Sequence, residues 1–415
     1  MMVLLAHPFG NANVRAVLLA LDQAGLLAKF VTSLGWSNAS PLINALPANL
    51  RAQMARRGYE LPHYKIKIQP AREIVRLLAG KLRQQWLTKH ELGRASIDRV
   101  WRELDKFAAA SLRESQQRQK IKAVYAYEDC AERLFEAASE LGIRRIYDLP
   151  IAYWETARRL LQEEAERYPE WEATLDGTRD SEEKLARKTH ELDLAELVIC
   201  PSTFVLDSLP RSTRDSKPCV VAPFGSPPAG NGGSAPRKPG DGPLRLLFAG
   251  GLTQRKGLAD LFAAMKLIAS KEVELIVMGS LLRPLPWYRE QFPHFIYERP
   301  RPHDDVLRLM RTCDVLVLPS IVEGRALVQQ EAMASGLPLI VTKNAGGDDL
   351  IVEGETGFLV PIRSPDSIAE KINWFATNRA SISGMAIAAQ RRASELTWQG
   401  YGEKVLAAIR SLTGE

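Results

Sequence analysis

Apolar residues in this 415-residue chain gather in short runs that alternate with stretches of helical periodicity. The strand-like runs occur at residues 3–6, 123–127, 145–148, 197–200 and 219–222, and then at 245–249, 273–278, 294–297, 315–318, 339–342 and 357–361. Helical patterns lie between them, for example at residues 13–27, 258–269 and 304–311. Continuous apolar runs are typical of strands buried on both faces, so the alternation predicts an α/β protein with parallel sheets.

A segment rich in Gly, Pro and Ser, residues 226–243, breaks this alternation and is typical of an interdomain linker. The chain is also longer than the roughly 250–300 residues at which single cores stop growing. We therefore expect two doubly wound, Rossmann-like domains, residues 1–225 and 244–395, followed by a C-terminal helix at residues 396–415.

The stretch from residue 36 to residue 120 fits this plan poorly, because its pattern is mostly helical and its charge strongly basic. Residues 51–94 hold 11 Lys and Arg against 3 Asp and Glu, whereas the whole chain has a net charge of +6. A local basic field attracts phosphates, anionic lipid surfaces or nucleic acid, and charge alone does not distinguish them. We interpret the stretch as a helical, basic insert in the N-terminal domain.

One expected helix of this insert has an apolar stripe, formed by Ile74, Val75, Leu78, Leu82 and Trp86. Basic and amide side chains surround the stripe. Such a helix either packs on its own domain or lies on a membrane surface, and both interpretations stay open here.

Composition favours a cytoplasmic protein without a metal or resident cofactor. No run approaches the roughly 18 apolar residues that a membrane-spanning helix needs. The first ten residues lack a basic leader and predict a buried strand rather than a signal peptide. The four cysteines lie far apart, as in reduced cytosolic proteins, and the six histidines show no metal-ligand spacing.

Two glycines and two cations stand between the strand at residues 245–249 and the next helix: Gly250, Gly251, Arg255 and Lys256. Glycines let backbone amides approach an anion closely, and a helix N-terminus adds positive potential. Arg offers a planar fork to phosphate oxygens, and Lys offers a compact charge. The segment is either a diphosphate site or a solvated loop with two surface cations.

Two glutamates flank the start of a predicted helix at residues 326–334. Glu323 lies in the loop before this helix, whose first amides are free to face a ligand. Glu331 lies within the helix, among apolar neighbours such as Leu327 and Val328. A carboxylate there can accept two hydrogen bonds from a vicinal diol such as a ribose. The alternative places Glu331 on a solvated helix face.

These segments, in this order and spacing, resemble the signature of retaining glycosyltransferase family 4, which has the GT-B fold. The resemblance covers nearly the whole C-terminal half. Residues 250–257 resemble the phosphate loop of the family, and Met278-Gly279-Ser280 resembles the glycine turn that approaches the nucleotide. Residues 344–347 and 354–359 resemble the loops that follow the second glutamate.

The resemblance implies a role for each matching residue of the donor site. Glu331 would bind the ribose, and Arg255 and Lys256 would neutralise the diphosphate leaving group. Glu323 would hold the donor sugar together with the amides that follow Gly324, which belong to Arg325, Ala326 and Leu327.

The chain departs from the family pattern at two places. Where the family commonly has Glu-Gly-Phe-Gly, this chain has Glu323-Gly324-Arg325-Ala326, which predicts an extra cation beside the sugar. Where many members have a His-Asp pair before the cleft, it has Tyr147-Asp148. Asp148 stays a catalytic candidate, and the alternative is an aspartate that only ends a strand.

The turn at residues 7–13 resembles the acceptor-side loop of the family. Gly10 would let the acceptor or diphosphate approach, with Asn11 beside it, and His7 is either a hydrogen-bond donor to the ligand or a packed histidine. Glu128 and Asp129 follow a predicted strand towards the same cleft. Paired acids also occur in glycosidases, but a hydrolase does not need a diphosphate loop.

The resemblance implies a metal-independent transferase that moves a sugar, with retention, from a nucleotide-diphosphate sugar to a hydroxyl. The acceptor would be a glycan, glycolipid or small molecule, and the N-terminal domain would bind it. The reaction would belong to surface polysaccharide or glycolipid synthesis. The last helices would cross back to the N-terminal domain. A silent nucleotide-sugar binder and a GT-B epimerase are the alternatives. We expect no nucleic acid partner, and peripheral contact with an anionic membrane stays open.

Overall fold

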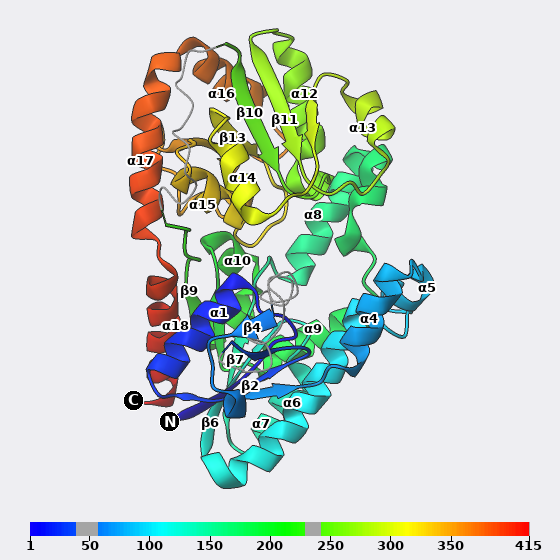
Figure 1. Cartoon of the computed structure of the whole chain (residues 1–415), viewed down its shortest axis with the longest axis vertical. Coiled ribbons are helices and arrows are strands. Elements are labelled where there is room, and N and C mark those ends of the chain that lie inside the picture. The colour runs from blue at the N-terminus through cyan, green and yellow to red at the C-terminus, as the bar shows by residue number, and fades with distance from the viewer. Residues whose placement is uncertain (39–56, 229–241, 415) are drawn as a thin grey trace.

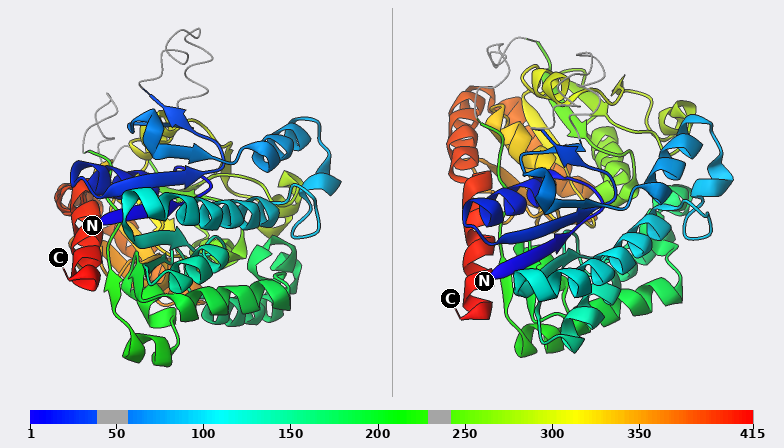
Figure 2. Two further views of the ribbon diagram at one scale, coloured as in Figure 1. Left: turned by 90° about the horizontal axis from the view of Figure 1, so that it is seen from below. Right: turned by 60° about the horizontal axis from the view of Figure 1, so that its bottom comes forward.

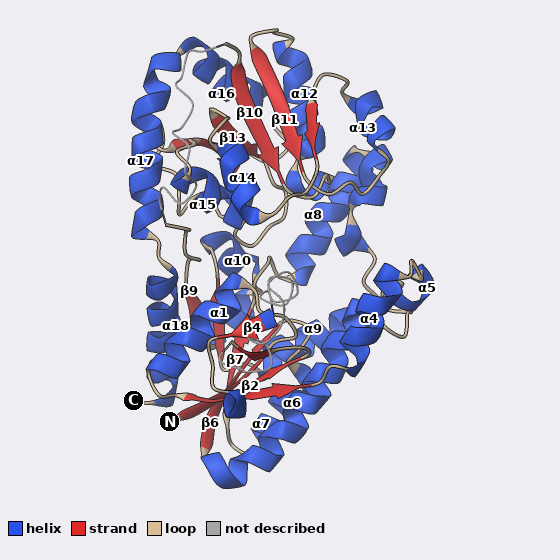
Figure 3. Cartoon of the chain, viewed as in Figure 1, coloured by secondary structure: helices blue, strands red, loops and turns tan. Residues whose placement is uncertain are grey.

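The structure, a computed structural model, describes residues 1–38, 57–228 and 242–414. Two α/β units lie one above the other, and the last two long helices run along one side of both (Figure 1). Helices flank both sheets (Figure 3). The predicted fold class, two doubly wound parallel sheets with C-terminal helices that cross back, is confirmed.

The N-terminal sheet has seven parallel strands in the order β5-β2-β1-β6-β7-β8-β9. Their bounds are β1 (Met2–Ala6), β2 (Leu27–Thr32), β5 (Ile66–Ile68), β6 (Ile121–Tyr127), β7 (Arg144–Asp148), β8 (Leu197–Cys200) and β9 (Cys219–Val221). The five strands predicted in this half are all present. The pattern does not predict β2 and the edge strand β5.

The first helix explains why the sequence pattern does not predict β2. Helix α1 (Ala12–Gln23) is shorter than the predicted helix at residues 13–27. Gly25 adopts a φ of +70°, which favours glycine and separates the helix from the next strand. Leu27, Phe30 and Val31 continue the helical spacing, yet they are buried in β2. The predicted end of the helix is therefore wrong.

Residues 36–120 are only partly the helical insert that their pattern predicts. The described part contains β3 (Trp36–Ser37), β4 (Gly58–Tyr59), η2 (His63–Lys65), β5, α4 (Ala71–Lys81), α5 (Gln85–Thr88) and α6 (Ile97–Gln119). Strand β5 pairs with β2, with Phe30 opposite Ile66, so the segment also contributes to the main sheet. Residues 39–56 lie outside the described part.

The other helices of this half are α7 (Glu132–Glu140), α8 (Trp154–Arg167), η3 (Pro169–Thr174), η4 (Asp176–Thr178), α9 (Glu182–Leu194), α10 (Thr203–Ser208) and α11 (Arg211–Ser216). Most of the predicted linker, residues 229–241, lies outside the described residues.

The C-terminal sheet has six parallel strands in the order β12-β11-β10-β13-β14-β15. Their bounds are β10 (Leu244–Ala249), β11 (Val273–Met278), β12 (Ile296–Glu298), β13 (Val315–Leu318), β14 (Leu339–Thr342) and β15 (Gly357–Val360). The helices are η5 (Gln254–Lys256), α12 (Leu258–Ile268), α13 (Leu285–Gln291), α14 (His303–Met310), α15 (Leu327–Ala334), η6 (Lys343–Ala345), α16 (Pro365–Thr377), η7 (Arg379–Ser381), α17 (Ile382–Glu395) and α18 (Trp398–Thr413). All six strands agree with the prediction.

Each half of the chain contributes a segment to the other domain. Helix α18 packs on α1 of the N-terminal domain, where Gly402 permits a close approach to Ala16 and Ala20. In the opposite direction, Trp171 of η3 is buried in the C-terminal core, with its ring centroid 4.8 Å from that of Trp287. The two domains are therefore joined by more than their linker.

The four cysteines are all free thiols, and three of them are buried. No helix in the described part of the chain combines the length and apolar character that a membrane span requires.

Candidate active site

A cavity of about 740 Å³ lies between the domains, where strands β1, β6, β10 and β11 end. The carboxyl ends of parallel strands are the usual place for ligands in α/β sheets. The N-terminal half lines the cavity with His7, Asn11, Ala12, Asn13, Trp101, Tyr127, Pro150 and Phe224. The C-terminal half lines it with Ala249, Gly250, Lys256, Met278, Val306, Glu323, Arg325, Ala326, Leu327, Val328 and Glu331.

Two glycines bring the ends of β10 and β11 together beneath the cavity. Gly250 and Gly279 have φ angles of +147° and +152°, which favour glycine. A Cβ on Gly279 would lie 1.6 Å from the carbonyl oxygen of Gly250, and one on Gly250 would lie 2.9 Å from Cδ of Lys256. Glycine is therefore required at both positions. Gly251 does not line the cavity, and a Cβ there would contact only Thr253, at 4.0 Å.

Lys256 and Arg255 both pair with Glu323. Lys256 Nζ lies 2.8 Å from Glu323 Oε2, and Arg255 Nη1 lies 3.1 Å from Oε1. The turn η5 presents both cations, and the side chain of its N-cap Thr253 accepts a hydrogen bond from the Arg255 amide at 3.1 Å. Burial alone would raise the pKa of Glu323. The attraction of Lys256 and Arg255 lowers it by more than burial raises it, so its pKa lies below the usual value. Lys256 and Glu323 line the cavity, and Arg255 contacts it only through Glu323.

Helix α15 turns its first residues and Glu331 towards the cavity. It begins at Leu327, one residue from the predicted start, and no side chain caps it at Ala326. Leu327 and Glu331 lie four residues apart on the same helix face, and both line the cavity. Burial raises the pKa of Glu331, and His303, whose Nδ1 lies 3.6 Å from Oε1, opposes this shift. Glu331 therefore does not lie on a solvated face.

The guanidinium of Arg325 belongs to the contact between the domains. Its Nη1 lies 2.9 Å from Asp349 Oδ2 and donates to the carbonyl of Pro201 at 3.3 Å. Beside it, a Cβ on Gly324 would lie 1.8 Å from the carbonyl oxygen of Pro150. The guanidinium of the extra cation expected beside the sugar is thus used in an ion pair within the C-terminal domain and in a hydrogen bond to the N-terminal domain, although part of Arg325 still lines the cavity.

His7 is both packed and at the cavity wall. Its ring lies 4.5 Å from that of Tyr127 and 5.2 Å from that of Trp101. Burial lowers the pKa of His7 to about 3, so the ring is neutral. Nδ1 contacts both the amide and the carbonyl oxygen of Phe9. Nε2 is therefore the ring nitrogen left to form a hydrogen bond with a ligand, and the tautomer sets whether it donates or accepts.

The other two acceptor-side residues lie in different environments. Asn11, the N-cap residue of α1, lines the cavity and makes no capping hydrogen bond with its side chain. Gly10 does not line the cavity, and a Cβ there would lie 2.5 Å from the hydroxyl of Tyr59. Close packing with Tyr59 is therefore the reason for a glycine at position 10.

Asp148, the fourth predicted catalytic residue, lies in a buried tyrosine cluster rather than at the cavity. Tyr125 and Tyr401 donate hydrogen bonds to its Oδ2 at 2.6 and 3.4 Å. Burial raises the pKa of Asp148 to about 7, although the tyrosine hydroxyls oppose this shift. Tyr147, at the family's histidine position, is also buried and donates to Glu191 at 3.3 Å. The geometry favours the strand-end interpretation for Asp148.

The acids Glu128 and Asp129 do not line the cavity. Lys188 Nζ lies 3.5 Å from Glu128, and Arg187 Nη2 lies 3.2 Å from Asp129. Their carboxylates are occupied by buried cations, which does not favour a glycosidase-like acid pair.

Two groups of histidines and acids in the described residues come close enough to share an ion: His90, Glu91 and Asp180, and Glu132, Glu136 and His190. Each joins segments far apart in the sequence, so spacing along the chain does not reveal them. Neither lines the cavity, and a reaction without metal stays a prediction.

Two parallel α/β domains that face one cavity, with a final helix crossing back, define the GT-B fold of glycosyltransferases. Residues 243–378 match the family Glycosyl transferases group 1.

Three comparisons show the extent of the likeness. Sucrose-phosphate synthase from Thermosynechococcus elongatus superposes with a TM-score of 0.67 at 16% identity, covering 100% of this chain and 99% of that one. Anabaena HepE in complex with UDP gives 0.61 at 15% identity, covering 99% and 100%. The D-inositol 3-phosphate glycosyltransferase of Corynebacterium diphtheriae is 32% identical over 106 residues, 26% of this chain and 25% of that protein. The chain spans between a quarter and about half the length of the curated relatives it matches.

Proposed function

We propose that this protein transfers a glycosyl group from a nucleotide-diphosphate sugar to an acceptor hydroxyl, with retention at the anomeric carbon and without a metal ion. The observation that carries the proposal is the cluster of Lys256, Arg255 and Glu323 at the cavity wall, beside the uncapped first turn of α15. The acceptor is a glycan, a glycolipid or a small molecule.

The cations supply what the leaving group needs. As the bond between the anomeric carbon and the diphosphate oxygen breaks, negative charge grows on that oxygen. Lys256, Arg255 and the first amides of α15 are fixed charges and dipoles that stabilise it without reorganisation. The chain contains no Asp-x-Asp element, which agrees with charge neutralisation by these groups in place of a metal.

The two glutamates divide the donor between them. Glu331 lies one helical turn from the start of α15, lines the same cavity, and accepts hydrogen bonds from ribose hydroxyls. Glu323 accepts hydrogen bonds from the sugar once the diphosphate shares its two cations. The acceptor oxygen forms its bond on the side from which the diphosphate leaves, and its proton passes to the departing phosphate oxygen.

His7 faces the donor site from the other domain, and its Nε2 atom is available for a hydrogen bond with a hydroxyl of the acceptor or of the sugar. HepE was solved with UDP, so UDP-sugars are the first donors to test.

The test incubates the purified protein with radiolabelled UDP-, GDP- and ADP-sugars and a bacterial lipid and glycan extract, in the presence of EDTA. The proposal is supported if label appears in the acceptor fraction and NMR shows that the new glycosidic bond has the same anomeric configuration as the donor. Recovery of an epimerised nucleotide sugar would identify an epimerase. Unchanged donor together with a raised melting temperature would identify a silent binder.

A further inference from the structure

Helix α4 packs on its domain with polar residues and turns its apolar residues outward. Glu73 is 0% exposed and Ala79 3%, whereas Ile74, Val75 and Leu78 are 42%, 46% and 52% exposed. A helix on a globular domain ordinarily shows the reverse arrangement, with its apolar stripe against the core. The apolar stripe therefore does not pack on its own domain, which was one of the two interpretations that the sequence left open.

The inversion follows from helical spacing. Glu73, Arg76 and Ala79 recur every three residues on the inner side, and Ile74, Leu78 and Leu82 recur every four residues on the outer side. Together with Val75, Leu77 and the neighbouring Trp86, the outer residues form one apolar surface. We call these six residues, Ile74, Val75, Leu77, Leu78, Leu82 and Trp86, the α4–α5 face; Leu82 and Trp86 are 68% and 65% exposed.

Ion pairs hold α4 in this orientation. The buried carboxylate of Glu73 lies 2.6 Å from Arg57 and 2.7 Å from Arg76, and Arg72 pairs with Glu103 of α6. Rotating the apolar side inward would separate Glu73 from Arg57 and Arg72 from Glu103, whereas the pair of Glu73 with Arg76 lies within α4 and would turn with it. The pairs to other segments therefore favour the outward orientation.

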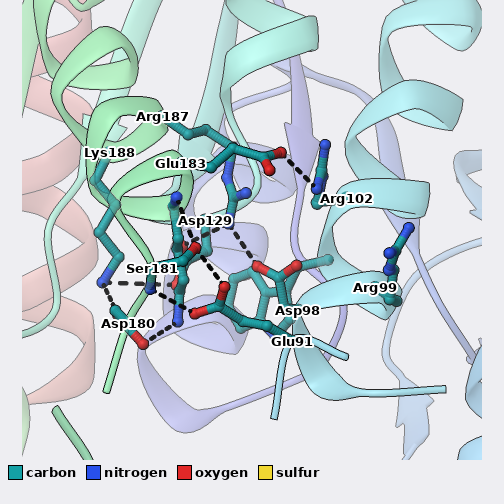
Figure 4. A network of polar contacts seen from close by, with 12 residues as sticks. Glu91, Asp98, Arg99, Arg102, Asp129, Asp180, Ser181, Glu183, Arg187 and Lys188 are labelled. Carbon is teal, nitrogen blue, oxygen red and sulfur yellow. Dashed lines mark hydrogen bonds and ion pairs between the residues drawn. The ribbon is translucent and has the colours of Figure 1, made fainter. Parts of the chain in front are cut away.

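The loop that follows α5 is fixed as well. Figure 4 shows Glu91 against Ser181 at the start of α9, and Asp98 against Arg187. The Ser181 amide donates to Glu91 at 3.0 Å, and Arg187 Nη2 lies 2.6 Å from Asp98 and 3.2 Å from Asp129. The α4–α5 face is thus a rigid part of the domain surface rather than a loosely attached helix.

Three exposed cations border the face: Lys81, Arg83 and Lys89. None of them forms an ion pair with an acid in the described part of the chain. An apolar surface bordered by such cations suits an anionic lipid layer. The apolar side chains can enter the boundary between headgroups and acyl chains, and the cations can pair with lipid phosphates. A second protein surface would need unpaired acids to match these cations.

We propose that the α4–α5 face binds an anionic lipid surface. Figures 1 and 2 show α4 and α5 at the edge of the N-terminal domain, on the side opposite α17 and α18, where they protrude beyond the neighbouring helices.

The inner side of α4, opposite the α4–α5 face, lies near the cavity. Arg76 of α4 lies over the ring of Phe9 at 5.8 Å, and Phe9 stands between His7 and Asn11, which both line the cavity. Resting on the proposed function, this position assigns the acceptor to a membrane-borne class. Lipid binding itself does not require that function.

Vesicle flotation of the full-length protein tests the proposal. The vesicles contain phosphatidylcholine alone or with phosphatidylglycerol. We expect the wild type to float with the anionic vesicles and to remain largely unbound with the neutral ones. The double variants Leu78→Glu/Trp86→Glu and Lys81→Glu/Arg83→Glu should each lose about tenfold or more of the bound fraction. Leu267→Glu, at a 58% exposed position of α12, is the matched control and should float as the wild type does.

Each other result has a definite meaning. Wild type that stays unbound with anionic vesicles overturns the proposal, as does equal flotation of all variants. A wild-type dimer in light scattering that Leu78→Glu/Trp86→Glu converts to a monomer assigns the face to a second copy instead. Binding to anionic vesicles without any glycosyl transfer would contradict the proposed function but would still support the lipid proposal. Circular dichroism shows whether each variant is folded. If Leu78→Glu/Trp86→Glu is unfolded, Lys81→Glu/Arg83→Glu still tests the proposal.

Discussion

Replacing Asp148 with Asn should make the protein more stable relative to the wild type as the pH rises from about 4 to about 7. The carboxyl titrates near 3.8 when unfolded, and burial raises its pKa to about 7 in the folded protein. Between these values the folded state holds a proton that the unfolded chain has released. The wild type therefore loses stability as the pH rises, by about 1.4 kcal/mol per pH unit.

The magnitude follows from the width of this window. From pH 3.8 to pH 7 the loss accumulates to about 4 kcal/mol, and above pH 7 it stays constant. Asn does not titrate, so Asp148→Asn avoids the loss. Its amide oxygen can still accept a hydrogen bond from Tyr125, but the larger, two-proton NH2 group inside the buried cluster costs about 1 kcal/mol at every pH. Below about pH 4 the variant is therefore slightly less stable, and near pH 7 it is more stable.

Urea unfolding of both proteins across this pH range measures the difference directly. Asp215→Asn, at a position whose side chain is 68% exposed, is the control and should give a difference that does not change with pH. A flat difference for Asp148→Asn, or one that falls towards pH 7, would refute the reasoning. Turnover should stay within about tenfold of the wild type; a loss of 10²-fold or more would return Asp148 to the chemistry of the site.

Three further predictions concern the donor site and the domain contact. Lys256→Ala should reduce turnover by about 10²- to 10³-fold in the radiolabel assay, while Lys266→Ala, at an exposed position of α12, should not. Trp171→Ala should lower the free energy of unfolding in urea by about 3–5 kcal/mol, because it empties a site in the C-terminal core. Gly324→Ala places a Cβ 1.8 Å from the carbonyl of Pro150, so it should cost about 1–3 kcal/mol in a thermal unfolding assay and also lower turnover.

The donor side of the cavity could be predicted from the sequence because each part of it is local. Gly250 and Lys256 lie on one strand-turn-helix segment, and Glu323 and Glu331 lie on another. In a parallel sheet both segments must leave the carboxyl edge, so their convergence follows from the strand pattern. The six strands of this domain were predictable for the same reason: each is a continuous apolar run.

The parts that could not be predicted depend on residues far apart in the chain. Asp148 is buried because Tyr401, 253 residues later, covers it from α18. The guanidinium of Arg325 donates a hydrogen bond to the carbonyl of Pro201, a contact that forms only when the two domains dock. Trp101 lines the cavity from α6, yet a Trp on an amphipathic helix is equally typical of a core position.

The exchange of segments between the domains changes the role of the N-terminal half. Gln254, the residue before the two cations, donates from Nε2 to Glu164 of α8 at 2.6 Å and to Asp260 at 2.8 Å. Arg167 lies 2.7 Å from Asp260, and Arg363 pairs with Glu164. Both carboxylates are fully buried, and separating α8 from the C-terminal domain would break the contacts of Glu164 with Gln254 and Arg363 and of Asp260 with Arg167. The turn that presents Lys256 is thus held in place by the other half of the chain, which positions the donor site as well as facing it.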